Sequence, residues 1–249
     1  MTDNMTVTVI MPAYNAAKTL EKTFEEVPLS IVDNIILVDD DSTDETVRVA
    51  KQLGIQHVIR HNKNLGYGAN QKTCFRKALE INSDIVVMIH PDYQYTPKMI
   101  PAMVALISNN LYEVVLGSRI LGKGALKGGM PLYKYLFNRL LTFIQNILIN
   151  QKLSEYHTGL RAYSSHVLRC IPFEKNSDDF LFDNQIITQI FHEGFEIAEI
   201  SCPTKYFKEA FYIGFLKSIQ YGFGVLGNSI RYCLHKNGIV NSHLYKSTK

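Results

Sequence analysis

The residues of this chain best suited to chemistry form short polar clusters that follow apolar runs. "NIILVDD" ends in Asp39 and Asp40, and "DIVVMIH" leads into Pro91, Asp92 and, two residues later, Gln94. A carboxylate and an amide oxygen at this spacing could bind one Mg²⁺ or Mn²⁺ together with phosphate oxygens. The alternative for the second cluster is a structural turn in which Pro91 ends a strand.

The first acidic cluster, "VDDDSTDET", also has two interpretations. Ser42 could cap a helix, and Glu45 three residues later would complete a capping box. That interpretation does not account for Asp39 and Asp40, which lie on the strand side of the turn. Strand-end carboxylates can accept hydrogen bonds from a nucleobase edge or from ribose hydroxyls.

Strand-like and helix-like segments alternate through the first 120 residues. We expect strands over 6–12, 34–40, 57–60, 84–90 and 113–118, and helices over 16–27, 43–53, 68–81 and 96–107. Near-continuous apolar strands alternating with helices predict a mainly parallel sheet covered on both faces. Ligands of such sheets bind at the carboxyl ends of the strands. The acidic clusters, together with Tyr14 and Asn15 after the first strand, should therefore meet at one edge of the sheet.

The composition narrows the class of protein. The chain has 249 residues, 46% of them hydrophobic and 20% charged, and its net charge of +3 without a dense basic run argues against a nucleic-acid partner. The four cysteines form no CxxC pair, so reduced thiols in a cytoplasmic setting are expected. The N-terminal segment lacks a basic region, and no run of roughly 18 apolar residues predicts a spanning helix.

Two apolar segments distinguish the second half. Residues 132–149 predict an apolar helix with a narrow polar stripe. Residues 211–235 are rich in aromatic residues and also contain several glycines and scattered basic residues. Such segments could lie at a membrane interface. Burial in the core, or in a contact between copies of the chain, is the alternative.

Five segments in order resemble the family 2 glycosyltransferases of the GT-A fold: "VIMPAYNA", "ILVDDDSTDET", "NKNLGYGANQ", "HPDYQY" and "GSR". Within that family the chain resembles the branch of dolichyl-phosphate mannose synthases and polyprenyl-phosphate sugar transferases. The resemblance extends from residue 6 to about 210. It implies a GT-A domain over 1–210, with a nucleotide-sugar half at about 1–120 and an acceptor half at about 121–210. An amphipathic appendage would follow over 211–249.

The resemblance implies a nucleotide-binding role for the residues that match the family's first motifs. These are Pro12, Tyr14, Asn15, Asp39, Asp40, Asn64, Gly66 and Gly68. Two positions depart from the pattern, because Ala16 stands where the family has an acidic residue and Asp41 where it has a glycine.

The segment "HPDYQ" resembles the family's metal-binding "DADxQ", which implies Asp92 and Gln94 as ligands of Mg²⁺ or Mn²⁺. His90 stands where relatives have the first aspartate. It could be a nitrogen ligand, a hydrogen-bond donor to a phosphate, or a residue that does not bind the metal. Imidazole suits Mn²⁺ better than Mg²⁺. The sequence favours an outer-shell or phosphate role for His90, with Asp92 as the main protein ligand.

Further matches imply residues that act on the phosphates and the acceptor. Arg119 lies in "GSR", and Arg161 ends "EYHTGLR", which resembles the family's "DxxSGFR". Asp183 in "FLFDNQII" is the candidate general base for a hydroxyl acceptor. Lys205 and Lys208 could replace the arginine of the family's "YxxRxxG".

The resemblance implies an inverting enzyme that moves a monosaccharide from a nucleoside-diphosphate sugar to a polyprenyl-phosphate or other lipid-linked acceptor. The expected location is the cytoplasm, peripherally on the membrane face. A soluble or cell-surface glycan acceptor is the second hypothesis, and a non-catalytic nucleotide-sugar binder is a third, motivated by His90. A sugar-nucleotide pyrophosphorylase is disfavoured, because "MPAYNAAKTL" is not a Gly-rich basic loop.

Overall fold

A seven-stranded sheet forms the centre of the computed structural model, which describes residues 5–206 and 215–245. The strands are β1 (Val7–Ala13), β2 (Asn34–Asp39), β3 (His57–Arg60), β4 (Ile85–Ile89), β5 (Val114–Ser118), β6 (Leu160–Ser164) and β7 (Ile197–Ser201). Their order is β3-β2-β1-β4-β6-β5-β7. Only β6 runs antiparallel to its neighbours, β4 and β5. The predicted, mainly parallel GT-A sheet is therefore confirmed.

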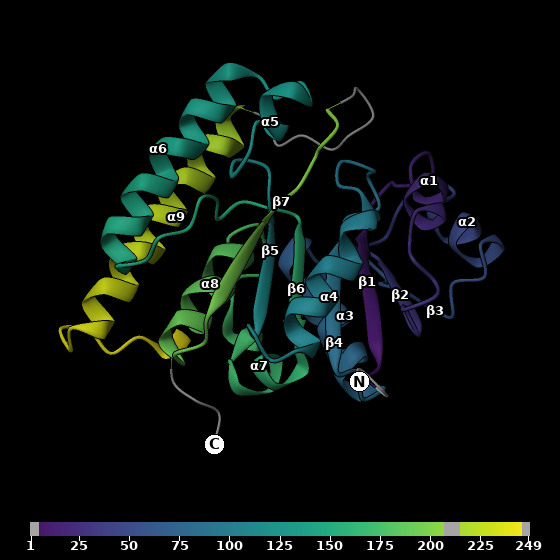
Figure 1. Cartoon of the computed structure of the whole chain (residues 1–249), viewed down its shortest axis with the longest axis horizontal. Helices are drawn as coiled ribbons and strands as arrows, with labels where there is room; N and C mark the ends of the chain where they lie inside the picture. The colour runs from purple at the N-terminus through teal and green to yellow at the C-terminus, as the bar shows by residue number, and fades with distance from the viewer. Residues whose placement is uncertain (1–4, 207–214, 246–249) are drawn as a thin grey trace.

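Helices cover both faces of this sheet (Figure 1). They are α1 (Leu20–Glu25), α2 (Thr46–Gln52), α3 (Tyr67–Glu80), α4 (Ile100–Ser108), α5 (Gly124–Lys127), α6 (Leu132–Ile149), α7 (Ser165–Cys170), α8 (Phe182–His192) and α9 (Phe215–Lys236). The strands read as continuous apolar runs because each buries both of its faces. In β4, Val86 and Met88 join the core under α3 and α8, whereas Val87 joins the core under α1 and α4.

The start of α2 differs from the prediction. The helix begins at Thr46, and the Ser42 hydroxyl accepts the backbone N–H of Asn15 at 2.8 Å instead of capping the helix. The Asp44 carboxylate accepts the N–H of Thr46 at 3.0 Å. The capping box of Ser42 and Glu45 is therefore wrong, because Ser42 is engaged by the loop after β1.

The two apolar segments of the second half form long helices that lie side by side. Helix α6 has the predicted bounds, and α9 packs against it where Gly222 meets the ring of Phe137. Figure 1 shows this pair along one side of the sheet. Within residues 5–206 and 215–245, no helix combines the length and apolar character needed to cross a bilayer.

Candidate active site

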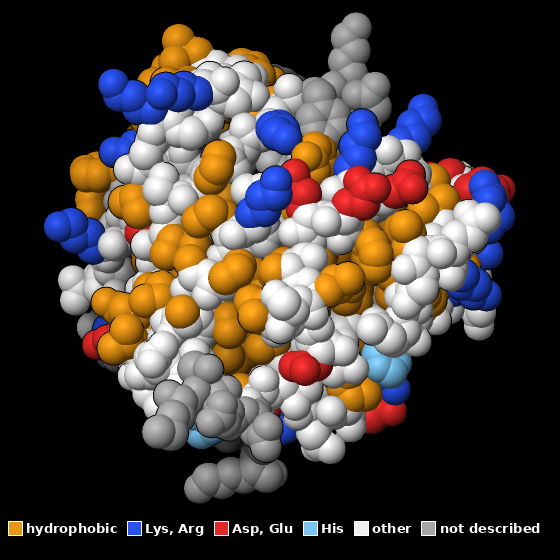
Figure 2. All heavy atoms as spheres, turned by 45° about the vertical axis from the view of Figure 1, so that its right-hand side comes forward, with side chains coloured by type: hydrophobic (Ala, Val, Ile, Leu, Met, Phe, Trp, Pro, Cys, Tyr) orange, Lys and Arg blue, Asp and Glu red, His pale blue; other side chains and the backbone are white. Residues whose placement is uncertain are grey.

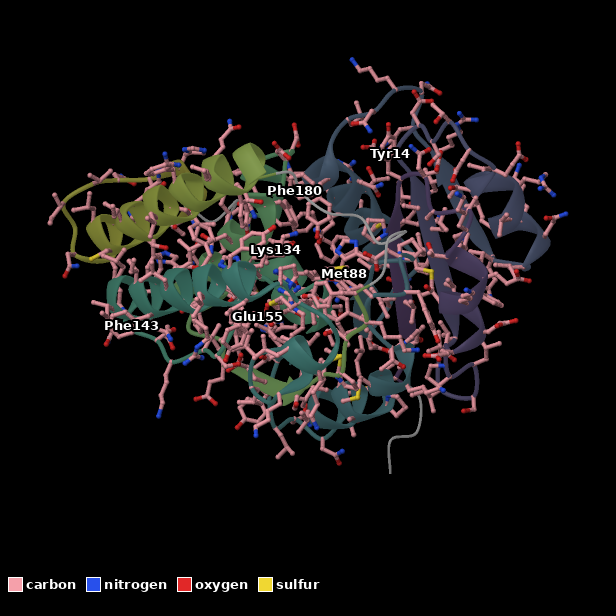
Figure 3. All side chains as sticks on the ribbon, turned by 90° about the horizontal axis from the view of Figure 1, so that it is seen from above. Tyr14, Met88, Lys134, Phe143, Glu155 and Phe180 are labelled. Atoms are coloured by element: carbon pink, nitrogen blue, oxygen red, sulfur yellow. The ribbon has the colours of Figure 1, made fainter. Side chains whose placement is uncertain are left out.

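A cavity of about 680 Å³ opens at the carboxyl ends of β1, β2 and β4. Figure 3 views the molecule from this side, and Tyr14 and Phe180, two of the lining residues, are labelled. The lining also includes these expected site residues: Pro12, Asn15, Asp40, Asn64, Gly66, His90, Asp92, Gln94, Arg119 and Asp183. The polar strand ends therefore converge, as the topology predicted. Asp39, Gly68 and Arg161 are not part of the lining.

Asp40 organises the wall of the cavity next to β2. Its buried carboxylate accepts the backbone N–H groups of Leu65 and Gly66, each at 2.9 Å. Nδ1 of His61 lies 2.7 Å from the same carboxylate. Asp39 is fully buried beside it and accepts the N–H of Ser42 at 3.0 Å, while its Oδ1 has no hydrogen-bond partner among the described residues. Asp40 thus holds the loop after β3 in place.

Gly66, directly before α3, and Gly68, in the first turn of α3, both lie against another segment of backbone. Gly66 has a φ of +100°, and a Cβ there would lie 2.5 Å from the carbonyl oxygen of Asp178. A Cβ on Gly68 would lie 2.3 Å from the carbonyl oxygen of Ser177. The N–H of Gly68 donates to Asp178 at 2.7 Å. Close approach of another backbone segment, the loop before α8, therefore requires glycine at both positions.

Asp92 presents a partly buried carboxylate to the cavity. One oxygen accepts the N–H of Gln94 at 3.0 Å. Burial raises the pKa of Asp92, and the lowering effect of nearby His90 offsets this only in part. Tyr93 between the two predicted ligands has a φ of +56°, an uncommon conformation for a bulky residue that is often found at functional sites.

These donors fit a hard divalent cation that is shared with a ligand. Asp92 and Gln94 offer a carboxylate and an amide oxygen, which suit Mg²⁺ or Mn²⁺. The part of the chain that the structure describes has no group of three or more His, Cys, Asp or Glu side chains that could hold an ion. An ion here would therefore depend on additional oxygens, such as those of a diphosphate.

The ring of His90 is held by Tyr67. Nε2 of His90 lies 2.9 Å from the Tyr67 hydroxyl, and the two rings stack with centroids 5.4 Å apart. The hydroxyl donates its proton to Asp183 at 2.8 Å, so it must accept one from Nε2. Burial lowers the pKa of His90, which favours the neutral ring, and Nδ1 then carries no proton. This proton count argues against a role for His90 as a phosphate donor through Nδ1.

Both carboxylate oxygens of Asp183 have partners within the protein. Its Oδ1 accepts from Gln71 at 2.8 Å, and its Oδ2 accepts from Tyr67 and lies 3.3 Å from the guanidinium of Arg161. Arg161 is fully buried behind the cavity and donates to the carbonyl oxygens of Thr158 and Asp183. The structure thus places Arg161 outside the cavity lining, where it balances the charge of Asp183.

Arg119 is the only Lys or Arg that lines the cavity among the described residues. Its Nε donates to Glu155 at 2.8 Å, as does its backbone N–H, and another guanidinium nitrogen donates to the same carboxylate. Burial raises the pKa of Glu155, but Arg119 lowers it more, and the net shift is downward. Burial lowers the pKa of Arg119, but Glu155 raises it more, and the net pKa lies well above the usual value. Arg119 is a permanent cation fixed at the cavity wall.

Some important residues were not foreseen from the sequence. Tyr67 and Gln71 lie one helical turn apart on α3 and both contact Asp183, a spacing that could have been noticed in "YGANQ". Tyr221 of α9 lines the cavity and lies 3.0 Å from Nδ1 of His157. No local signal identified that pair.

The predicted substitutes for the family arginine lie elsewhere. Lys205 is outside the main cavity, with its Nζ 3.1 Å from the Tyr93 hydroxyl and 4.4 Å from the centre of that ring. Lys208 lies outside the described residues.

The chain matches the model of glycosyl transferase family 2 over residues 8–171. It belongs to this family. The predicted enzyme class, a sugar transferase, is thereby confirmed.

Relatives of this glycosyltransferase support the predicted branch. It is 32% identical over 179 residues to the UDP-N-acetylglucosamine–dolichyl-phosphate N-acetylglucosaminyltransferase of Methanococcus voltae, covering 66% of this chain and 71% of the relative. It is 31% identical over 141 residues to a dolichol-phosphate mannosyltransferase of Pyrococcus furiosus, covering 54% of this chain and 39% of the relative.

A solved structure shares the fold of this glycosyltransferase. Glucosyl-3-phosphoglycerate synthase from Mycobacterium tuberculosis, in complex with Mn²⁺, uridine diphosphate and glucosyl-3-phosphoglycerate, aligns with a TM-score of 0.69. The alignment covers 96% of this chain and 82% of the synthase at 20% sequence identity. At that identity, the likeness concerns the fold alone.

Proposed function

We propose that this glycosyltransferase moves a monosaccharide from a nucleoside-diphosphate sugar to a polyprenyl phosphate, with inversion at the anomeric carbon. One structural relationship carries the proposal: of the two helices with exposed apolar side chains, α9 lines the cavity, and α6 contacts the partner of a lining residue. Tyr221 of α9 lines it, and Asn138 of α6 donates at 2.9 Å to Glu155, the partner of Arg119. A lipid phosphate that enters the cavity past Tyr221 of α9 would come to lie beside Arg119. Two relatives are named as transferases that act with dolichyl or dolichol phosphate, and these names support this acceptor class.

In this proposal the donor lies along the carboxyl ends of β1, β2 and β4. Tyr14, Asn15 and Asp40 lie on the nucleotide side, within the donor half at about 1–120, and Asp183 lies on the acceptor side. Asp92 and Gln94 hold Mg²⁺ or Mn²⁺ together with the diphosphate. The bound ion supplies neutralisation of the charge that develops on the leaving diphosphate. The complex of the distant structural neighbour with Mn²⁺ and uridine diphosphate supports this choice of ion.

The hydrogen bonds of Asp183 favour a phosphate acceptor over a glycan hydroxyl. A hydroxyl acceptor needs a general base, and both oxygens of Asp183 are already engaged by Gln71, Tyr67 and Arg161. A phosphate is ionised at neutral pH and can attack without losing a proton. Arg119 then orients the attacking phosphate and stabilises the negative charge in the transition state. Arg161 acts indirectly, by holding Asp183.

The test is a transfer assay with purified protein. UDP- and GDP-sugars are each combined with a short-chain polyprenyl phosphate or with the matching polyprenol, and Mg²⁺, Mn²⁺ or EDTA is added. We expect metal-dependent transfer to the phosphate and none to the alcohol, with an inverted anomeric configuration by NMR. Transfer to polyprenol or to glycan hydroxyls, with the lipid phosphate inert, would contradict the proposed acceptor.

A further inference from the structure

Helix α6 is oriented with its polar stripe inward. Asn138, Thr142 and Gln145 are buried, and Asn138 bonds to Glu155 beneath the cavity. On the opposite side, Phe143 and Ile147 remain 63% and 64% exposed. A surface helix of a protein in water normally shows the reverse arrangement, with its apolar stripe in the core.

The apolar surface continues from α6 to α9, and we call it the α6–α9 face. It comprises Leu132, Tyr133, Leu136, Phe137, Leu140, Phe143 and Ile147 of α6, and Ile219, Phe223 and Ile230 of α9, all of them exposed. Figure 3 shows Phe143 at the outer edge of α6, whereas Glu155 lies in the interior. An exposed apolar surface of this extent marks an interaction site.

The charge around this face is one-sided. In the sequence, residues 114–154 and 215–245 contain no Asp or Glu but carry nine basic residues: Arg119, Lys123, Lys127, Lys134, Arg139, Lys152, Lys217, Arg231 and Lys236. The rest of the chain has 17 Lys and Arg against 23 Asp and Glu. Arg139, Lys152, Arg231 and Lys236 are exposed. Figure 2 shows acidic side chains mainly at the upper right of the face drawn, with basic ones beside them, and basic and hydrophobic side chains at its upper left.

We propose that the α6–α9 face docks peripherally on an anionic lipid bilayer. Its apolar side chains enter the boundary between headgroups and acyl chains, and the basic side chains contact anionic headgroups. A second copy of the chain is a poorer occupant, because pairing this face with itself would bring two acid-free, basic surfaces together.

This proposal rests on the proposed function and adds the surface that delivers the acceptor. Tyr221 lies on α9 between Ile219 and Phe223 of the face, and it also lines the cavity. A polyprenyl phosphate could therefore present its phosphate to the cavity while its chain stays in the bilayer.

Vesicle flotation of the full chain tests the docking directly. We expect the protein to float with vesicles of phosphatidylglycerol and phosphatidylcholine, to float poorly with phosphatidylcholine alone, and to be released by salt. The double variant Leu136→Gln/Phe143→Gln should lower vesicle affinity on the order of 10-fold or more. Leu111→Gln, at a position 60% exposed between α4 and β5, is the matched control and should bind like the unmodified protein.

A charge reversal separates electrostatic from apolar contributions. Arg139→Glu should weaken binding to anionic vesicles, whereas Arg48→Glu, on exposed α2, should not. Unmodified protein that stays unbound with anionic vesicles, or equal binding by the double variant, would overturn the proposal. A dimer that dissociates in the double variant would assign the face to a second copy instead.

Two transfer assays distinguish a failure of the docking proposal from a failure of the proposed acceptor. Transfer to a water-soluble short-chain acceptor should be unchanged in the double variant, while transfer to a long-chain acceptor in vesicles should fall. Short-chain transfer without any vesicle binding would reject the docking surface alone. Vesicle binding without transfer to any lipid phosphate would reject the acceptor alone.

Discussion

The hydroxyl of Tyr67 lies between His90 and Asp183, 2.9 Å from Nε2 of the imidazole and 2.8 Å from the carboxylate. Because a hydroxyl has a single proton, this contact fixes which nitrogen of His90 is protonated. The resemblance to the family leads us to expect an aspartate where this chain has His90, and the orientation of His90 depends on a partner that lies outside the motif.

Replacing Tyr67 with Phe tests that dependence. The change leaves the N–H of His90 without a partner and removes one of the two contacts of Asp183 Oδ2, and it should cost about 1–3 kcal/mol of folding free energy. Loss of a group that orients a metal-site residue should lower kcat/KM by about 10–100-fold. Urea denaturation and the transfer assay measure the two effects. Tyr112→Phe, at an exposed position before β5, is the control, and equal kcat/KM in both variants would remove Tyr67 from the site.

Asp92→Asn should abolish metal-dependent nucleotide binding while the protein stays folded. Because burial raises the pKa of Asp92, its ionised form destabilises the native state, and its contribution to stability declines as pH rises through the folded-state pKa. In the absence of metal, the Asp92→Asn variant should therefore have a higher free energy of unfolding than the unmodified protein at neutral pH. It should also lose the rise in Tm that uridine or guanosine diphosphate produces with Mn²⁺. An unchanged metal-dependent rise in Tm would exclude Asp92 as a ligand, and Glu80→Gln, at an exposed position on α3, controls for loss of charge.

Glu155→Gln should destabilise the fold strongly. It leaves the buried Arg119 guanidinium without its counter-charge, which costs about 3–5 kcal/mol at pH 7. The pKa of Glu155 is lowered in the folded state, so its stabilisation is present above the usual value near 4.5 and is lost as pH falls through the folded-state pKa. The difference between variant and unmodified protein should shrink in acid. Denaturation across pH measures it, with Glu174→Gln in the exposed pair with Arg76 as the control. A difference that did not change with pH would contradict the ionic explanation.

Gly68→Ala should disrupt the contact between α3 and the loop before α8. The added methyl would lie 2.3 Å from the carbonyl oxygen of Ser177, so backbone must shift at a cost of about 1–3 kcal/mol. Gly227→Ala in α9 has no atom within 4 Å of the new Cβ, and it should be neutral or stabilise by up to about 1 kcal/mol. Thermal unfolding compares the two, and equal Tm values would show that the loop moves freely.

Local patterns predicted much of the architecture. Apolar runs identified β1, β2, β4 and β5, and the polar residues after them identified one edge of the sheet as the site, because parallel strands end together. The antiparallel strand β6 and the edge strand β7 were not foreseen. Their sequences, LRAYS and IAEIS, each contain a charged residue and end in serine, so neither forms the continuous apolar run that marks β4.

The sequence by itself therefore determined the fold class, the edge of the sheet that forms the site, and the candidate ligands Asp92 and Gln94, because these follow from short-range periodicity and spacing. Tertiary structure alone decided the partners: Tyr67 with His90, and Arg161 with Asp183. It also decided that α6 buries its polar stripe, because Asn138 is drawn inward by Glu155, 17 residues along the chain. An amphipathic pattern specifies two faces, but only the neighbouring groups decide which of them meets the core.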